Sequence, residues 1–182
     1  MDAQLLIEPS GAAGPGELPR PPADLGAGLA EAVAAGGILL RLGSSRYTVS
    51  MADVAEVVPL PVATRIPGAP PFLTGVANWR GRMLPVLDVR PLLRAEPLPL
   101  ATSARLVVVQ SGSVTAGIVA EAVPGVYDAS LDDAGPPPAT LPPEAARLVS
   151  GQVADAAGPI AVLDVEALLA LRDRLDRRRH GA

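Results

Sequence analysis

Short apolar segments, separated by proline and glycine, make up most of this sequence from Gly36 onward. The 21 prolines keep the chain extended or looped between these segments. Apolar residues between these breaks, partly alternating with polar ones, favour strands. We expect strands at Ile38–Leu42, Arg46–Met51, Phe72–Ala77, Met83–Val89, Arg105–Gln110, Ser113–Val119, Val123–Asp128, Gly151–Ala156 and Ile160–Leu163.

Many short strands with few helices between them are typical of small β-barrels and sandwiches. The predicted fold class is therefore mainly all-β, with short helices. Arg90–Arg94 can form one helical turn, and Asp53 can cap another that leads into Val54–Val58. A longer helix is expected from Asp164, which can cap a run of apolar residues at helical spacing up to Leu175.

Composition divides the chain into three parts. Residues 1–35 are rich in Pro, Gly and Ala and have almost no large side chains after Ile7. Such a segment buries too little apolar surface to offset the entropy of ordering it, so we predict a flexible leader, with a weak helix around Leu25–Ala35. Residues 36–175 are predicted to form the folded domain, and residues 176–182 an Arg-rich tail.

Two parts of the sequence resemble each other at an offset of 76 residues. Leu87–Leu93 and Leu163–Leu169 are identical at five of seven positions, and Gly75 falls on Gly151. Each copy has a glycine-led strand, a turn, an apolar strand and an aspartate that can begin a helix. This pattern predicts a duplicated barrel and gives Asp88 and Asp164 a structural role.

Charge and hydropathy argue against nucleic-acid binding and membrane insertion. The net charge of −4 supplies no basic face for phosphates, and Arg177–His180 reads most simply as a solvated helix end. No apolar run approaches the roughly 20 residues of a membrane-spanning helix, and the N-terminus does not resemble a signal peptide. The absence of Cys fits a reducing compartment. We therefore predict a cytoplasmic protein.

The sequence contains little that could catalyse a reaction. The single His, His180, lies three residues from the C-terminal end, where a catalytic triad is not expected. With no Cys, a zinc site would consist mostly of carboxylates, and the acidic residues are scattered. Gly11–Gly16 lacks the flanking strand, helix and Lys of a phosphate-binding loop. We predict a binding protein with no catalytic residues, no metal and no cofactor.

The segment Gly75–Val89 is the strongest candidate for a binding site. Two apolar strands flank a tight turn that is expected to display Asn78, Trp79 and Arg80, while Gly81 permits the positive φ that such turns need. Trp and Arg are the residue types most enriched in binding hot spots. The second copy of the duplication lacks this turn. Because the turn is specific to the first copy, we place the binding function on the turn.

This segment, with Pro67–Thr74 before it, resembles the signature of the CheW family of chemotaxis coupling proteins. That signature is approximately Pro-x-x-Pro-x-Phe-x-x-Gly-Val-x-Asn-x-Arg-Gly, followed by a strand ending in Pro-Val-x-Asp-Leu-Arg. The resemblance covers about Gly36–Leu171. In this chain Trp79 stands where many members have Leu, and the Pro-rich leader is longer than usual.

The resemblance implies two five-stranded β-barrels packed on one core with a groove between them. It implies a non-catalytic adaptor between the cytoplasmic tip of methyl-accepting chemoreceptors and the regulatory domain of a CheA-type histidine kinase. The positions that match receptor-contacting residues of the family are Val54, Glu56, Gly75 and Arg80. Together with the turn residues they give the predicted partner-binding set: Val54, Glu56, Gly75, Asn78, Trp79 and Arg80.

Each of these residues also has a structural interpretation. Arg80 could pair with an acid of its own barrel, and Trp79 could pack at the rim of the core. Gly75 could be needed for its backbone φ or for the close approach of another segment. Glu56 could be a solvated charge, and Val54 a core residue. Two other functions stay open: an adaptor of a related CheA-like pathway such as type IV pili, and a ligand-binding or carboxylate-based enzymatic barrel.

Overall fold

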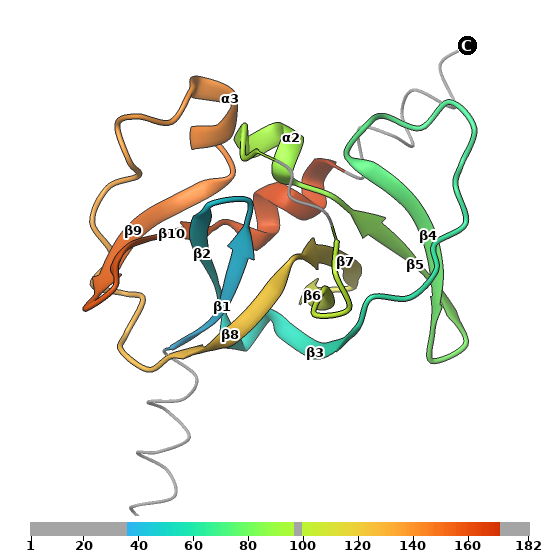
Figure 1. Cartoon of the computed structure of the whole chain (residues 1–182), viewed down its shortest axis with the longest axis horizontal. Helices are drawn as coiled ribbons and strands as arrows, with labels where there is room; N and C mark the ends of the chain where they lie inside the picture. Colours follow the sequence, from blue (N-terminus) through green and yellow to red (C-terminus); the bar gives the residue numbers. More distant parts are fainter. Residues whose placement is uncertain (1–35, 97–99, 172–182) are drawn as a thin grey trace, which may run out of the picture.

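A computed structural model describes residues 36–96 and 100–171 of the chain (Figure 1). The predicted leader, its weak helix and the Arg-rich tail lie outside the described residues. The strands are β1 (Gly37–Leu42), β2 (Ser45–Ser50), β3 (Val54–Pro59), β4 (Leu73–Trp79), β5 (Arg82–Leu87), β6 (Arg105–Ser111), β7 (Val114–Ala120), β8 (Ala122–Tyr127), β9 (Val149–Asp155) and β10 (Gly158–Leu163). Short helices are η1 (Met51–Asp53), α2 (Arg90–Leu93) and α3 (Pro143–Ala146), and residues 165–171 form a further helix.

The strands form two five-stranded sheets, which lie on opposite sides of the molecule in Figure 1. Sheet A has the order β8-β1-β2-β10-β9, and sheet B has the order β3-β6-β7-β5-β4. Neighbouring strands are antiparallel except for β10 with β2 and β5 with β7, which are parallel. The predicted all-β fold with short helices is confirmed, and we call the two units barrel A and barrel B.

The duplication seen in the sequence is present in the structure, but its two copies are intertwined. Shifting β4 and β5 by 76 residues gives the bounds of β9 and β10, and shifting β3 by 68 gives those of β8. The first copy, β1 to β5, contributes β1 and β2 to sheet A and β3 to β5 to sheet B, while the second copy does the reverse. Each barrel therefore contains strands from both copies, so the duplicated unit of the sequence is not by itself one barrel.

Three apolar clusters hold this arrangement together. The largest lies between the barrels and combines residues of sheet A, such as Leu40 and Val49, with residues of sheet B, such as Val107 and Ile118. A smaller cluster fills barrel B around Val86 and Val108. A third, around Ile160, fills barrel A. Because burial of apolar surface is the main stabilising contribution, the shared cluster makes the two barrels one folding unit.

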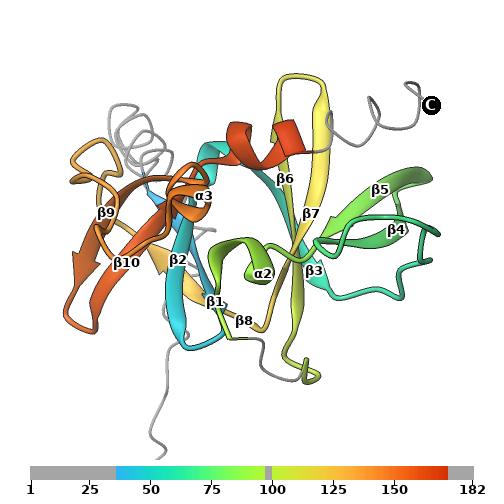
Figure 2. The ribbon, with the colours of Figure 1, turned by 90° about the horizontal axis from the view of Figure 1, so that it is seen from above.

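The helices lie against the shared cluster. The helix at 165–171 buries Val165, Leu168 and Leu169 there, and Figure 2 shows it crossing above the strands toward β6 and β7. The predicted cap is confirmed, since Asp164 Oδ1 accepts a hydrogen bond from the Ala167 N–H at 2.8 Å. Asp88 differs from Asp164, because α2 is preceded by Val89 at its N-cap and has no side-chain cap. Asp88 accepts hydrogen bonds from the Arg90 backbone N–H at 3.1 Å and from the Arg90 side chain.

Arg90 belongs to a buried ion cluster that the sequence did not indicate. Its guanidinium contacts Asp88 Oδ2 at 2.7 Å and Glu121 Oε1 at 2.5 Å, and the Arg90 and Glu121 side chains are 7% and 3% exposed. The other Glu121 oxygen accepts from the Gly43 N–H at 2.5 Å. Glu121 lies between β7 of barrel B and β8 of barrel A, so the cluster stands where the chain crosses from one barrel to the other.

Candidate functional site

The predicted turn is narrower than expected. Asn78 and Trp79 are the last residues of β4, paired with Met83 and Arg82 of β5, and only Arg80 and Gly81 form the turn. Both turn residues have positive φ, 51° and 76°, as two-residue hairpins with a type I′ turn require. Asn78 stabilises this turn, because its Oδ1 accepts a hydrogen bond from the Gly81 N–H at 3.0 Å.

Three of the predicted residues meet at one point of barrel B. The Trp79 indole N–H donates to Glu56 Oε2 at 2.7 Å. The Arg80 guanidinium lies 3.1 Å from the same oxygen and 5.2 Å from the centre of the Trp79 ring. Glu56 is on β3 and Trp79 is on β4, which are the two edge strands of sheet B. This contact therefore closes the barrel along the line where its edge strands meet, which we call the seam.

The seam contact orients Arg80 toward solvent. The Arg80 side chain is 68% exposed, while the Glu56 side chain is 33% exposed, and Trp79 packs partly against the interior of barrel B. The carboxylate and the indole ring hold the guanidinium from one side, by an ion pair and a cation–π contact. The outer side of the guanidinium stays accessible to a partner that offers a carboxylate or a carbonyl.

Gly75 and Val54 occupy different places from this contact. A Cβ on Gly75 would lie 2.2 Å from the Thr64 carbonyl oxygen, so the loop before β4 can approach only glycine. Thr64 and Val76 exchange two backbone hydrogen bonds at that point, of 2.8 and 2.9 Å. Val54, at the start of β3, packs against the cluster between the barrels. The structure thus brings together Glu56, Trp79 and Arg80, with Asn78 supporting the turn.

Two exposed residues of the same hairpin were not in the predicted set. Met83 is 70% exposed and pairs with Asn78 on the outer face of β4 and β5. Arg82 is exposed and follows the turn directly. The alternation of a strand places Met83 on the face opposite the buried Leu84, and this was the signal that could have identified it.

The corresponding hairpin of barrel A is built differently. Asp155 takes the place of Trp79 at the offset of 76. Both of its carboxylate oxygens accept hydrogen bonds from the Arg46 guanidinium of β2, in a bidentate ion pair. The hydrogen bond from Arg46 lowers the pKa of Asp155 to about 2. Both hairpins therefore hold an ion pair within their own barrel, but the Arg46 side chain of barrel A is 26% exposed, whereas that of Arg80 in barrel B is 68% exposed.

The described part of the chain offers no obvious place for a metal ion. Among residues 36–96 and 100–171, no group of three or more His, Cys, Asp or Glu side chains is close enough to hold one. Over the same ranges, no helix has the length and apolar character needed to cross a membrane.

Taken together, two intertwined barrels around a shared core, with one ordered arginine hairpin, define a two-barrel binding domain. The comparison with protein families identifies its type. A model of the CheW-like domain family matches residues 36–173, and the chain belongs to this family.

Several curated proteins are similar to the chain. Protein PilI of Pseudomonas aeruginosa is 37% identical over 96 residues, which cover 53% of this chain and 54% of PilI. Protein FrzA of Myxococcus xanthus is 37% identical over 98 residues, 54% of this chain and 61% of FrzA. The chemotaxis protein CheW of Klebsiella aerogenes is 26% identical over 132 residues, 72% of this chain and 80% of that protein. The chain thus matches little more than half the length of the first two relatives.

A solved structure has the same fold. The scaffolding protein TtCheW from Thermoanaerobacter tengcongensis superposes with a TM-score of 0.66 at 24% sequence identity, over 72% of this chain and 85% of that protein. This likeness concerns the fold, and it agrees with the predicted pair of five-stranded barrels.

Proposed function

We propose that the protein is a non-catalytic signalling adaptor that couples methyl-accepting chemoreceptors to a CheA-type histidine kinase. Membership of the CheW-like family supports this proposal, as does the similarity to proteins named as chemotaxis proteins. A rigid pair of barrels can hold two partners in a defined relative geometry. A small receptor rearrangement then shifts the kinase between activity states through differential affinity for those states, without covalent chemistry.

The receptor-binding surface in this proposal is the hairpin tip of barrel B. The observation that carries it is the exposed Arg80 guanidinium, held over Trp79 and against Glu56. A side chain already held in place loses less entropy on binding than a free one, which favours a specific contact. Arg80 would bind a carboxylate or carbonyl of the receptor tip, and Asn78 would keep the turn in the binding geometry. Val54 and Gly75 would act mainly through the shape of the surface.

A pull-down of the full chain against purified receptor signalling tip and kinase regulatory domain tests this proposal. We expect the wild type to bind both partners, and Arg80→Asp to bind the receptor tip at least about 30-fold more weakly, as for a hot-spot arginine. Arg82→Asp is the matched control, because Arg82 is exposed on the same hairpin and forms no ion pair within the described residues. Its effect should be several times smaller.

The outcomes separate the function from the site. A wild-type protein that binds neither partner contradicts the adaptor function. If Arg80→Asp folds normally and binds both partners as the wild type does, the surface assigned here is wrong although the adaptor function stands.

A second candidate is an adaptor of a related CheA-like pathway, such as one controlling type IV pili. It is favoured by the similarity to PilI and FrzA, which are not named as chemotaxis proteins. Pull-downs with the kinase regulatory domains of both kinds of pathway distinguish the two candidates, because the cognate kinase should bind more tightly.

A further inference from the structure

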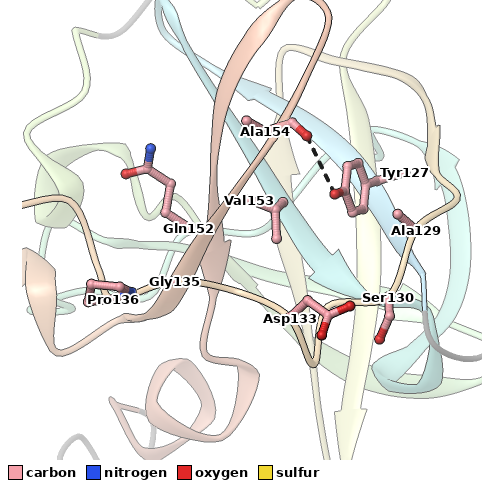
Figure 3. A pocket seen from close by; sticks show the side chains of 9 residues that line it. All are labelled: Tyr127, Ala129, Ser130, Asp133, Gly135, Pro136, Gln152, Val153 and Ala154. Carbon is pink, nitrogen blue, oxygen red and sulfur yellow. Dashed lines mark hydrogen bonds between the residues drawn. The ribbon is translucent and has the colours of Figure 1, made fainter.

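Barrel A carries a pocket of about 540 Å³ at the seam between β8 and β9. This volume lies within the range of small-ligand and side-chain pockets. Figure 3 shows the pocket between the β9 strand, the Tyr127 ring and the loop that carries Ser130 and Asp133. Val153 points into this space, and Gln152 points to the other side of the strand.

The pocket corresponds in position to the seam of barrel B. There the edge strands β3 and β4 are joined by the 2.7 Å hydrogen bond from Trp79 to Glu56. In barrel A the equivalent edges β8 and β9 are joined by the Tyr127 hydroxyl, which lies 3.5 Å from the Ala154 carbonyl oxygen. This long contact is a weak bond. The barrel A seam is therefore the more open of the two.

The β9 edge can accept another backbone beside this pocket. Gly135 pairs with Gln152 through two hydrogen bonds of 2.9 Å, so the N–H and C=O of Gln152 point away from β10. By the alternation of an antiparallel ladder, those of Ala154 point the same way. Ala154 pairs across the ladder with Pro159, which has no N–H to donate. Within the described residues, the backbone that begins to cover this edge at Gly135 does not extend to Ala154.

The charge at the pocket selects the kind of ligand. Asp133 lines the pocket, and among the residues that the structure describes no basic side chain does so. Two further exposed carboxylates, Asp128 and Asp132, belong to the same loop. Arg46, which reaches the neighbouring β9–β10 turn, is already paired with Asp155. An extended peptide with a cationic side chain would satisfy both the backbone edge and the carboxylate.

We propose that this seam pocket binds an extended segment of a partner protein, which pairs with β9 at Ala154 and directs an Arg or Lys side chain to Asp133. This site goes beyond the adaptor function proposed above and does not depend on it. The pocket lies on β9, on the opposite side of the molecule from the β4–β5 hairpin in Figure 1. The two sites can therefore be occupied at the same time.

Titration of the isotope-labelled full chain by NMR tests the proposal. The probes are the peptide acetyl-Thr-Val-Arg-Val-Thr-amide and its partner with Glu in place of Arg. We expect the Arg peptide to shift the amide signals of Ala154 and Asp133 and to bind about fivefold more tightly than the Glu peptide. Asp133→Asn should weaken the Arg peptide about threefold, whereas Asp132→Asn, one residue away and outside the pocket lining, should leave it unchanged.

The backbone part of the proposal has its own pair of variants. Ala154→Pro removes the edge N–H and should abolish peptide binding, while Ala154→Ser keeps the N–H and should preserve it. Unfolding curves of both variants show whether the fold is intact, and Asp133→Asn decides the matter if Ala154→Pro does not fold.

Three results overturn the proposal. The first is equal affinity for the two peptides, or shifts confined to the β4–β5 hairpin. The second is a shift of Ala154 with protein concentration alone, which would make a second copy the occupant. The third is no peptide effect at all; if the Asp133→Asn spectrum then changes at residues 1–35, the leader is the occupant.

Discussion

Trp79 joins the two edges of barrel B through a single polar atom. Replacing it by Phe keeps a ring beneath Arg80 but removes the N–H that Glu56 accepts at 2.7 Å. We expect Trp79→Phe to lower the free energy of unfolding by about 1.5 kcal/mol, at the lower end for a hydrogen bond to a charged group because Glu56 is partly solvated. Urea denaturation measures this value. The control is Tyr127→Phe, which removes only the 3.5 Å contact of barrel A and should cost much less.

Gly75 and Gly81 both have positive φ but different surroundings. A Cβ at Gly81 meets nothing within 4 Å, whereas at Gly75 it meets the Thr64 carbonyl oxygen at 2.2 Å. Gly81→Ala should therefore cost about 1 kcal/mol, the conformational part alone. Gly75→Ala should cost at least about 2 kcal/mol more, because the loop carrying Thr64 has to move. Equal unfolding midpoints for the two variants would contradict the close approach.

The duplication makes Gly75 easier to interpret than it was in the sequence. Its counterpart Gly151 admits the same kind of loop, since a Cβ there would lie 2.7 Å from the Gly135 carbonyl oxygen. A glycine that serves the same purpose in a copy without the arginine turn is first a structural residue. Its place in the predicted binding set stays a prediction, which the pull-down of Arg80 variants does not test.

At the scale of elements, local patterns predicted the strands well. The nine expected strands all have counterparts, with ends that differ by a few residues, because alternation and turn residues act over short distances. β3 was the least certain: Val54–Val58 was expected only to follow a helical turn, and it forms a strand paired with β6. The pairing of β1 and β2 with strands of the second copy, and of β6 and β7 with strands of the first, was not predictable. Strand pairing depends on long-range contacts that no local pattern records.

The Arg90 cluster was missed for a similar reason. Asp88 and Arg90 are close in sequence, but Glu121 lies 31 residues away and reaches Arg90 only through the crossover between barrels. The hydrogen bond to Asp88, followed by that to Glu121, raises the pKa of Arg90 against the opposing effect of burial. A cation held by two carboxylates in this way stays charged at every pH at which the protein is folded.

Loss of this cation should be far more damaging than loss of an exposed one on the same helix. Arg90→Gln leaves the Glu121 carboxylate buried without its cation, so we expect a loss of about 3 kcal/mol or more. Arg94→Gln removes an ion pair with Glu144, in which the Arg94 side chain is 68% exposed and the Glu144 side chain 56% exposed. Its loss should lower the free energy of unfolding by at most about 1 kcal/mol. Chemical denaturation of the two variants measures the difference, and comparable losses would mean that the cluster does not join the barrels.

At the scale of the whole molecule, the duplication places two acidic pairs in corresponding positions. Glu121 directly precedes β8 and Asp88 directly follows β5, while Asp53 directly precedes β3 and Asp164 directly follows β10. Arg90 neutralises the first pair, but the residue at its position in the other copy is Glu166, which is exposed. Burial and then the nearby Asp164 charge raise the pKa of Asp53. The two crossovers between barrels thus differ in charge balance.

This difference predicts a pH effect on stability. Because the pKa of Asp53 is raised on folding, the folded state holds its proton more strongly than the unfolded state does. Stability contributed by Asp53 is therefore lost as the pH rises through the region above its ordinary value of 3.8. Asp53→Asn, which cannot ionise, should be more stable than the wild type at pH 7, and the difference should disappear near pH 3.

Urea denaturation of both proteins at several pH values tests this prediction, with the difference taken at each pH. The difference is needed because Asp155 acts in the opposite sense. Its pKa of about 2 contributes stability that is lost as the pH falls from about 4 toward 2, equally in both proteins. If Asp53→Asn is less stable than the wild type at pH 7, Asp53 contributes to the fold as a charge, and the predicted pH effect is wrong.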